Sequence, residues 1–336
     1  MAIVRDIMPQ FELFQPATAE DALELLARYG TDAWVLAGGL DSLEWFKDRI
    51  KRPGVLVDLS RVKELRGVRE VDGGLEIGAM TTLTEVVRHP AVRQKFAILS
   101  EAAESAASPQ IRNQGTIGGN ISQDTRCWYY RNGWTCYRAG GNMCYADTPT
   151  GMNREHAIFD ADRCVAVNPS DTAPALVALE AQMVIRSARG TREVKARDYF
   201  IGPGYDITRM TVLGPGDLLT AIRVPATWAG ALFSFEKVRD RQVWDFPLVN
   251  IASAAVLSGE RIDRMSLVVN AVAAHPVRLT RVEDAVRGQP RNETTADLGG
   301  RLAVAGAQPL RLNAYKVTLV RNLVKRAIRG KEEPWA

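Results

Sequence analysis

Four cysteines fall within one short stretch of this 336-residue chain, which contains no others: Cys127, Cys136, Cys144 and Cys164. Four thiolates are the ligand set of an iron–sulfur cluster and of a structural zinc site. Metal–thiolate bonds can also order a segment that has no hydrophobic core of its own. The cysteine set therefore predicts a metal centre within residues 124–164.

The spacing of the cysteines, C-x8-C-x7-C-x19-C, leaves the kind of centre open. Structural zinc sites usually contain closely spaced C-x2–4-C pairs, which this chain lacks. Wide spacing is compatible with a larger cluster, but free cysteines are also often simply buried. From spacing alone, a cluster, a zinc ion and inert thiols are about equally well supported.

A first glycine-rich segment could bind an anionic group, because adjacent glycines let backbone N–H groups converge on an anion. It follows a predicted strand, precedes a predicted helix, and has the sequence Leu36-Ala37-Gly38-Gly39-Leu40-Asp41-Ser42. An ordinary strand–helix turn has the same pattern, and this motif alone favours that simpler interpretation.

A second segment of the same kind runs through residues 110–121 and contains Thr116, Gly118, Gly119 and Asn120. Two such turns in one domain could hold the two ends of a pyrophosphate. Neither matches the G-x-G-x-x-G pattern of a βαβ unit, and that pattern occurs nowhere in the chain. The sequence therefore argues against a Rossmann dinucleotide domain.

No side chains suggest a catalytic set. The histidines, His89, His156 and His275, are far apart in sequence, and no Ser/His/Asp or Cys/His arrangement is evident. Lys237 lies on a predicted strand, where a solvated or paired lysine is the default interpretation. We therefore predict no catalytic residue in this chain.

The composition is that of a globular protein with a sizeable core, at 46% hydrophobic and 24% charged residues. A net charge of +4 is too small and too dispersed to indicate nucleic-acid binding. No apolar run is long enough to span a bilayer. The N-terminus, Met1–Asp6, lacks the features of a secretory signal, so we expect a cytoplasmic protein, where clustered cysteines more often bind metal than form disulfides.

Hydrophobic spacing indicates a mixed α+β chain. A capping box at Thr18–Asp21 predicts a helix that ends near Gly30. Further helices are expected at 43–49, 82–107 with an interruption at Pro90, 176–179, 279–287 and 313–329. Strands are expected at 33–36, 55–57, 75–79, 183–185, 234–238, 251–257 and 265–272. Residues 124–164 show no sustained period, and a loop of that length needs a functional reason or is disordered.

These turns and their surroundings resemble the FAD-binding subunit of the xanthine dehydrogenase family of molybdenum hydroxylases. The matching stretches, which cover nearly the whole chain in order, are 36–41, 57–65, 77–83, 110–120, 168–176 and 235–237. The resemblance implies a two-part FAD-binding domain of the vanillyl-alcohol-oxidase (PCMH) type, followed by a smaller C-terminal α+β domain like that of CO dehydrogenase flavoproteins. We expect the first domain at 1–226, with subdomains at about 1–58 and 59–226, and the second at 227–336.

By resemblance, residues 36–42 and 116–120 bind the FAD pyrophosphate and ribityl region, and Asp171 and Lys237 lie near the rest of the flavin. One departure concerns Leu40, since the family usually has Thr or Ser after the paired glycines. A hydroxyl contact to phosphate is thereby lost, which Ser42 could restore.

The cysteine segment is similar to an insertion in the flavoprotein subunits of 4-hydroxybenzoyl-CoA reductase and periplasmic aldehyde oxidoreductase. The matching residues are 126–130 and 162–164. In those subunits four cysteines hold a [4Fe–4S] cluster, so the resemblance favours a cluster over zinc.

The resemblance implies an electron-transfer subunit of a heterotrimer. A large partner would hold the molybdenum cofactor, and a small partner would carry [2Fe–2S] clusters. The external partner would be NAD, ferredoxin, quinone or oxygen, and export as a folded complex through a partner's signal is compatible with this chain. A stand-alone FAD-dependent oxidase and a non-catalytic, zinc-stabilised binding protein are the alternatives.

Overall fold

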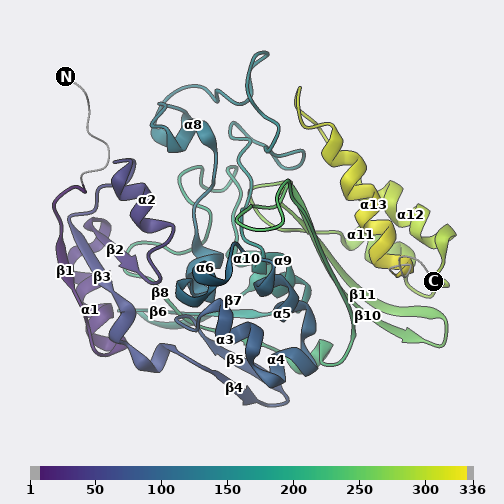
Figure 1. Cartoon of the computed structure of the whole chain (residues 1–336), viewed down its shortest axis with the longest axis horizontal. Coiled ribbons are helices and arrows are strands. Elements are labelled where there is room, and N and C mark those ends of the chain that lie inside the picture. The colour runs from purple at the N-terminus through teal and green to yellow at the C-terminus, as the bar shows by residue number, and fades with distance from the viewer. Residues whose placement is uncertain (1–7, 331–336) are drawn as a thin grey trace.

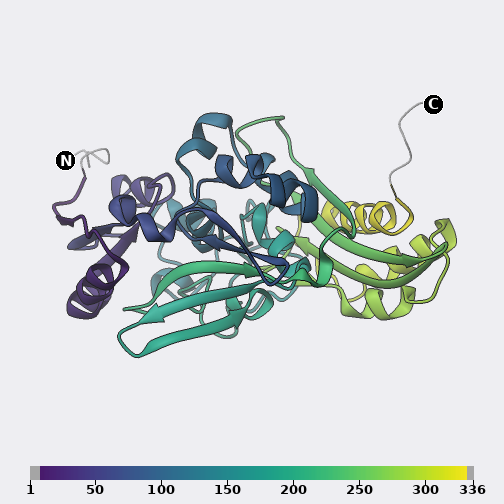
Figure 2. The same ribbon diagram turned by 90° about the horizontal axis from the view of Figure 1, so that it is seen from below.

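The computed structural model describes residues 8–330, so Met1–Asp6 lies outside the described part of the chain. Within residues 8–330, no helix is long and apolar enough to cross a membrane. The described residues form three β-sheets with helices packed on them (Figures 1 and 2). The N-terminal sheet and the C-terminal helices lie at opposite ends of the long axis, and the cysteine segment covers the middle (Figure 1).

The first sheet is parallel, with strand order β1-β3-β2. Its apolar side chains pack against α1, whose predicted capping box between Thr18 and Asp21 and whose end at Gly30 are both confirmed. The first glycine-rich segment connects β2 to α2, as the sequence predicts, and α2 begins at Ser42, the last residue of that segment. The elements are β1 (Glu12–Phe14), α1 (Ala19–Tyr29), β2 (Ala33–Leu36), α2 (Ser42–Lys47) and β3 (Val55–Asp58).

The second sheet is antiparallel, with strand order β4-β5-β8-β6-β7. Helices from residues 83–122 and 172–199 pack on it and enclose the largest apolar core. The interruption predicted at Pro90 is confirmed, since Pro90 opens a new helix. The strands are β4 (Val68–Val71), β5 (Gly74–Gly78), β6 (Gln182–Ser187), β7 (Gly190–Lys195) and β8 (Leu218–Val224). The helices are α3 (Leu83–Arg88), α4 (Pro90–Lys95), α5 (Ala97–Glu104), α6 (Pro109–Gln114), α7 (Ile117–Ser122), α9 (Thr172–Ala178) and α10 (Ala196–Tyr199).

The third sheet, of order β12-β11-β10-β9, is antiparallel and buried on both faces. Along β10, Ile251 contributes to the core beneath the C-terminal helices, whereas Ala252 and Ala254 contribute to the central core. This alternation follows from the two-residue repeat of a strand. The elements are β9 (Leu232–Val238), β10 (Val249–Ser258), β11 (Arg261–Asn270), β12 (Val277–Arg278), α11 (Thr280–Val286), α12 (Glu293–Ala303) and α13 (Tyr315–Arg329).

Residues 124–164 form a long irregular segment, as the absence of a sequence period predicts. It contains only α8 (Trp128–Arg131) and one 3-10 helix. The C-terminal part of the chain fastens it, because the Asn313 Nδ2 donates to the carbonyls of His156 and Ala157, and the Lys316 Nζ donates to that of Glu155. The 3-10 helices of the chain are η1 (Gly30–Asp32), η2 (Leu59–Arg61), η3 (Lys63–Leu65), η4 (Tyr137–Ala139) and η5 (Ala226–Trp228).

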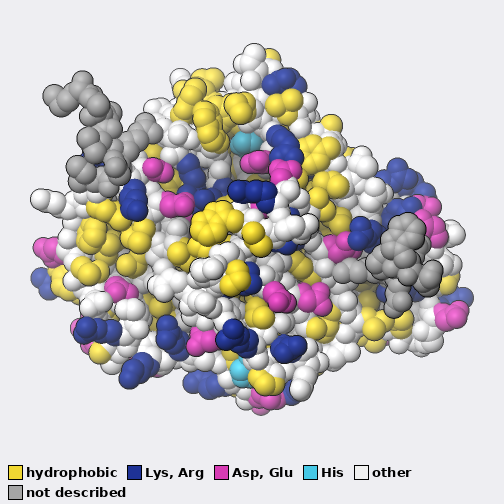
Figure 3. Space-filling model, in the orientation of Figure 1, with side chains coloured by type: hydrophobic (Ala, Val, Ile, Leu, Met, Phe, Trp, Pro, Cys, Tyr) yellow, Lys and Arg dark blue, Asp and Glu magenta, His cyan; other side chains and the backbone are white. Residues whose placement is uncertain are grey.

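Hydrophobic side chains gather on the surface over the cysteine segment, at the top of Figure 3. Trp128 and Trp134 are roughly half exposed there, whereas Tyr129 and Tyr130 are buried. The two buried tyrosines therefore belong to the packing of the segment, and the two tryptophans form part of its outer surface.

Candidate functional site

A cavity of about 490 Å³ opens where the two glycine-rich segments meet. Both segments line it, together with the start of α9. The predicted cofactor-binding residues on its wall are Ala37, Gly38, Gly39, Leu40, Asp41, Ser42, Thr116, Gly119, Asn120 and Asp171. Residues that are far apart in the sequence are thus brought to one hollow.

The two segments touch each other through their backbones. A Cβ atom on Gly38 would collide with the carbonyl oxygen of Gln114, and the Gln114 Nε2 donates to the Gly38 carbonyl at 3.3 Å. The second segment is not one turn, since α6 and α7 meet at Gly115. The Thr116 hydroxyl caps α7 by accepting from the Gly119 N–H at 3.0 Å. The two segments therefore form one wall of the cavity together.

Three of the predicted cofactor-binding residues do not line the cavity. Leu36 ends β2 and packs beside Trp45 and Phe46. Gly118 is buried, and a Cβ atom there would lie 2.7 Å from the Ala79 carbonyl oxygen. Lys237 lies behind the wall and contacts Asp171. Leu36 and Gly118 therefore lie next to residues that line the cavity but do not line it themselves.

Asp171 and Lys237 form a buried ion pair at one side of the cavity. The Lys237 Nζ lies 2.7 Å from the Asp171 Oδ2 and also donates to the carbonyls of Ser105 and Asp245. Burial raises the pKa of the Asp171 carboxyl to about 6, although Lys237 and Asn250 oppose the shift. Burial likewise lowers the pKa of Lys237. Of the solvated or paired lysine that the sequence suggested, the structure shows the paired one.

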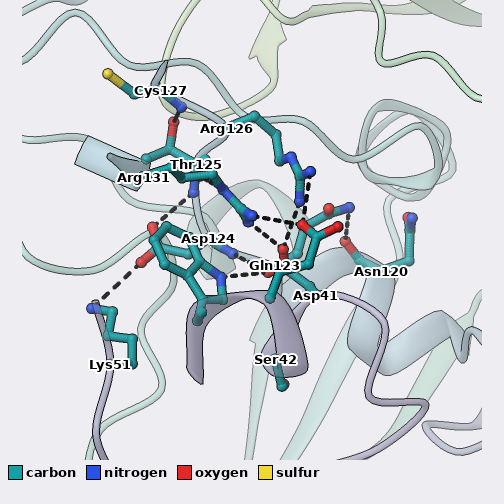
Figure 4. A network of polar contacts seen from close by, with 12 residues as sticks. Asp41, Ser42, Lys51, Asn120, Gln123, Asp124, Thr125, Arg126, Cys127 and Arg131 are labelled. Carbon is teal, nitrogen blue, oxygen red and sulfur yellow. Dashed lines mark hydrogen bonds and ion pairs between the residues drawn. The ribbon is translucent and has the colours of Figure 1, made fainter. Parts of the chain in front are cut away.

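The Asp41 carboxylate fastens the first glycine-rich segment to the cysteine segment (Figure 4). Its oxygens accept from the Trp45 Nε1 at 3.0 Å, from the Arg126 guanidinium at 2.9 Å and from the Arg131 guanidinium. The backbone N–H of Asp124 donates to it at 3.3 Å. Asp41 is thus fully engaged by protein donors at the edge of the cavity.

The hydroxyl of Ser42 accepts from the Trp34 Nε1 at 3.0 Å, and Ser42 lines the cavity. The hydroxyl hydrogen remains available for another acceptor, because a hydroxyl donates one hydrogen bond and accepts two. Leu40 reaches over Gly115 on the same wall. The compensation of Leu40 by Ser42 remains a prediction that this arrangement permits.

Several residues of the cavity wall were not among the predicted ones. They come from the cysteine segment, from the stretch before β8 and from the loop after β9: Asp124, Arg126, Arg138, residues 208–211, 213–214, Asp217 and residues 244–246. The Gly/Pro-rich composition of residues 202–217 was the one available sequence signal for the second group. The others come close only through the tertiary fold.

All four cysteines line a second, small cavity, together with Arg138, His156 and aromatic side chains. None of the four forms a disulfide. Among the described residues, no group of three or more His, Cys, Asp or Glu side chains is arranged to hold a single metal ion. The four thiols therefore line the same cavity, but they do not surround a single metal position.

The surroundings of these thiols are largely apolar. Burial raises the pKa of Cys127 to about 12, and burial also raises the pKa of Cys164, which Arg138 opposes. The His156 Nε2 lies 3.4 Å from the Cys127 sulfur, and burial holds the pKa of this histidine at about 4. His156 is therefore neutral, and a positive charge reaches the thiols mainly from Arg138.

The first cavity thus joins the two glycine-rich segments, polar side chains and one partner of a buried ion pair around one hollow. Within the described residues it contains no nucleophile paired with a base. Such a site fits a cofactor-binding chain with an α+β fold in two main parts.

Comparisons with known proteins show the family to which this chain belongs. The family model for the FAD binding domain in molybdopterin dehydrogenase matches residues 9–227, and that for the CO dehydrogenase flavoprotein C-terminal domain matches residues 233–330. The chain is 30% identical to the carbon monoxide dehydrogenase medium chain of Hydrogenophaga pseudoflava, over 96% of this chain and 97% of that one. It is 33% identical to the aldehyde oxidoreductase FAD-binding subunit PaoB of Escherichia coli, over 85% and 87% of the two chains.

Solved structures agree with these relationships. Carbon monoxide dehydrogenase from Hydrogenophaga pseudoflava has a chain that superposes with a TM-score of 0.76 at 29% identity, covering 96% of this chain and 98% of that one. Reconstituted CO dehydrogenase from Oligotropha carboxidovorans gives 0.77 at 26% identity, with coverages of 96% and 97%. The expected FAD-binding plus C-terminal flavoprotein fold is confirmed.

This chain belongs to the FAD-binding medium subunits of the molybdenum hydroxylase family. The family relationship expected from the sequence is confirmed at this level, and FAD is the cofactor of the matched domain. The exact domain limits, the individual FAD contacts and the extra cluster stay predictions.

Proposed function

We propose that this chain is the electron-transfer subunit of a molybdenum hydroxylase or dehydrogenase complex, with FAD in the larger cavity and a [4Fe–4S] cluster between its four cysteines. A large partner would hold the molybdenum cofactor, and electrons would pass between the [2Fe–2S] clusters of a small partner and an external NAD, ferredoxin, quinone or oxygen. FAD supplies the ability to take up electrons singly and release them in pairs. We propose the cytoplasm as the place of assembly.

The cavity shared by both glycine-rich segments is the observation that carries the FAD part of the proposal. Residues 37–42 line this cavity from the first segment, and Thr116, Gly119 and Asn120 line it from the second. The pyrophosphate and ribityl chain would lie between them. Asp171, backed by Lys237, would lie nearer the rest of the flavin. These side chains bind and orient the cofactor, and none of them is positioned to act on a substrate.

The convergence of all four thiols on one cavity supports the cluster. Zinc holds its sulfur ligands at about 2.3 Å and therefore needs them to meet around one point, an arrangement that the described residues lack. A [4Fe–4S] cluster takes one thiolate on each of its irons, so its ligands lie farther apart. The aromatic and apolar lining would keep water from the cluster.

Composition analysis of the purified chain tests this proposal. We expect flavin absorption bands, broad iron–sulfur absorbance and four irons per FAD. Cys144→Ser should lose the iron, whereas Met143→Ala, at the neighbouring exposed position, should keep it. Flavin without iron would refute the cluster, and an unchanged iron content in Cys144→Ser would refute the ligand assignment. Absence of both cofactors would favour the binding-protein alternative.

A further inference from the structure

The two cavities share one residue. Among the described residues, Arg138 alone lines both the cavity between the glycine-rich segments and the cavity between the cysteines. It lies in η4, two positions after Cys136, so the cysteine segment itself places it at the boundary. Any cofactors in these cavities would lie on either side of its side chain.

The Arg138 guanidinium is buried and held in place. Its side chain is 3% exposed, it pairs with the Asp124 carboxylate, and it donates to the Ile207 carbonyl at 2.7 Å. Its carbon lies 5.4 Å from the centre of the Tyr130 ring. These contacts hold it rigidly at the boundary, and they come from the cysteine segment and from the stretch before β8.

One donor of this guanidinium remains unused. The Arg138 Nε is buried and has no hydrogen-bond partner in the described part of the chain. Buried donors in native proteins are nearly always paired, so an unpaired one indicates a missing partner. Sulfur of a cluster or an oxygen of a bound cofactor has the acceptor chemistry that this N–H requires.

The charge of Arg138 is permanent. A guanidinium is not deprotonated in proteins, and the Asp124 carboxylate pairs with this one. A buried charge acts more strongly than an exposed one, because less water screens it. Reduction adds negative charge to a cofactor, so a fixed buried cation next to it favours the reduced form.

We propose that Arg138 is a positioning residue that couples the two redox sites: its buried cation raises the reduction potentials of both the flavin and the cluster. Asp124, which pairs with Arg138 and lines the flavin cavity, moderates the effect from the other side. The inference rests on the proposed function, since it needs both cofactors to be bound.

Redox titration of the purified holoprotein tests this coupling, with the cluster followed by electron paramagnetic resonance and the flavin by visible absorbance. In Arg138→Gln, both potentials should fall. We expect the reduced-to-oxidised ratio of the cluster at a fixed potential to fall about tenfold, which corresponds to ~59 mV for a one-electron couple. Arg138→Lys keeps the charge and should restore most of the shift.

The matched control is Arg163→Gln, which removes an arginine next to Cys164 whose side chain is 56% exposed. Solvent screens that charge, so both potentials should stay at their wild-type values. If the role of Arg138 were only structural, its variants would lose iron or flavin. The potentials would then not fall in Arg138→Gln and recover in Arg138→Lys.

Asp124→Asn gives a second test with the opposite sign, and it serves even where Arg138→Gln fails to fold. Without the carboxylate, Arg138 is less neutralised, so both potentials should rise. Unchanged potentials in Asp124→Asn, or in a folded and fully loaded Arg138→Gln, would overturn the inference alone. A wild-type protein without iron would instead overturn the proposed cluster, and the coupling with it.

Discussion

At the scale of single residues, the site depends on a close approach of two backbones. Gly38 presses against the Gln114 carbonyl, and Gly39 adopts a φ of 77°, which favours glycine. The first glycine therefore sets the distance between the two segments, and the second sets the direction of the chain. Both requirements lie in the backbone, so they can be tested by adding a single methyl group.

Gly38→Ala should weaken FAD binding by at least about tenfold, because the added Cβ pushes α6 away from the first segment. The affinity can be measured by adding FAD back to the apoprotein. Gly204→Ala is the matched control, since a Cβ there would meet its nearest neighbour at an ordinary 3.6 Å. Wild-type affinity in Gly38→Ala would show that the contact between the segments does not shape the flavin site.

Lys237→Met should destabilise the protein by about 3–5 kcal/mol, because it leaves the Asp171 carboxylate buried without its partner. Unfolding in denaturant provides the measurement. Lys95→Met removes a similar pair with Glu70 on the surface and should change stability little. Equal effects of the two variants would contradict the importance of burial.

Local sequence patterns were enough to predict some residues of the site but not others. Gly38 and Gly39 could be predicted because they follow a predicted strand as a pair, and the cysteines could be predicted because four of them fall in one short stretch. Arg138 and Asp124 carry no such signal, since their role arises from a cavity wall that is complete only after residues 207–217 fold against them. Spacing along the chain does not encode such contacts.

At the scale of elements, α2 and the cysteine segment act as one unit through Asp41. Arg126 and Arg131 both reach its carboxylate, and Glu44 on α2 accepts from the same two side chains. Because Asp41 also lines the larger cavity, order in the cysteine segment and the shape of that cavity depend on each other.

Asp41→Ala should loosen the cysteine segment, because it removes one of the two carboxylates that hold Arg126 and Arg131 and leaves only Glu44. Trypsin should then cut after Arg126 and Arg131 faster than in the wild-type protein, as peptide mapping would reveal. Asp48→Ala, which removes an exposed carboxylate at the end of the same helix, is the control. An unaltered cleavage rate in Asp41→Ala would mean that other contacts hold the segment.

Helix α13 carries a buried amine whose ionisation affects stability. Burial lowers the pKa of Lys316 from 10.5 to about 7, and its Nζ donates to the Ala271 carbonyl at 2.7 Å. Between these two pH values the unfolded chain binds more protons than the folded one, so stability rises with pH in this window. The buried charge is a penalty that disappears as the amine loses its proton.

The free energy of unfolding should therefore increase from pH 7 towards pH 10, and Lys316→Met should reduce that increase. Denaturant unfolding at several pH values would measure both slopes. Lys325→Met on the same helix is the control, because Asp297 and Glu293 raise the pKa of Lys325. Identical slopes in wild type and Lys316→Met would refute the assignment.

The strand and helix predictions were most successful where one hydrophobic period dominates, as in α1 and α13. Helix α12 escaped prediction, since Gly299 and Gly300 lie within it and break the expected pattern. Those glycines fit because α13 packs closely there, and a Cβ on Gly300 would lie 3.0 Å from the Arg321 carbonyl oxygen. Helices α6 and α7 were missed because their short sequences, PQIRNQ and IGGNIS, are rich in polar residues or glycine and show no hydrophobic period.

At the scale of the whole molecule, no nucleophile paired with a base lines the larger cavity among the described residues. The isolated subunit, free of molybdenum, should therefore oxidise no aldehyde or carbon monoxide, and yet pass electrons from a reduced nicotinamide or ferredoxin to a dye. Assays with each donor and substrate would decide this, and the assembled complex serves as the positive control. Substrate oxidation by the single chain would refute the subunit proposal.

The hydrogen bonds from Asn313 and Lys316 to residues 155–157 also have a consequence for the synthesis of the protein on the ribosome. His156 and Asn313 are separated by 157 positions. A ribosome that adds roughly 5–20 residues per second needs on the order of ten seconds to cover that span. During this interval the four thiols already exist, but the residues that fasten their segment do not. The cysteine segment can therefore reach its final packing only late in synthesis, well after its own residues have been added to the chain.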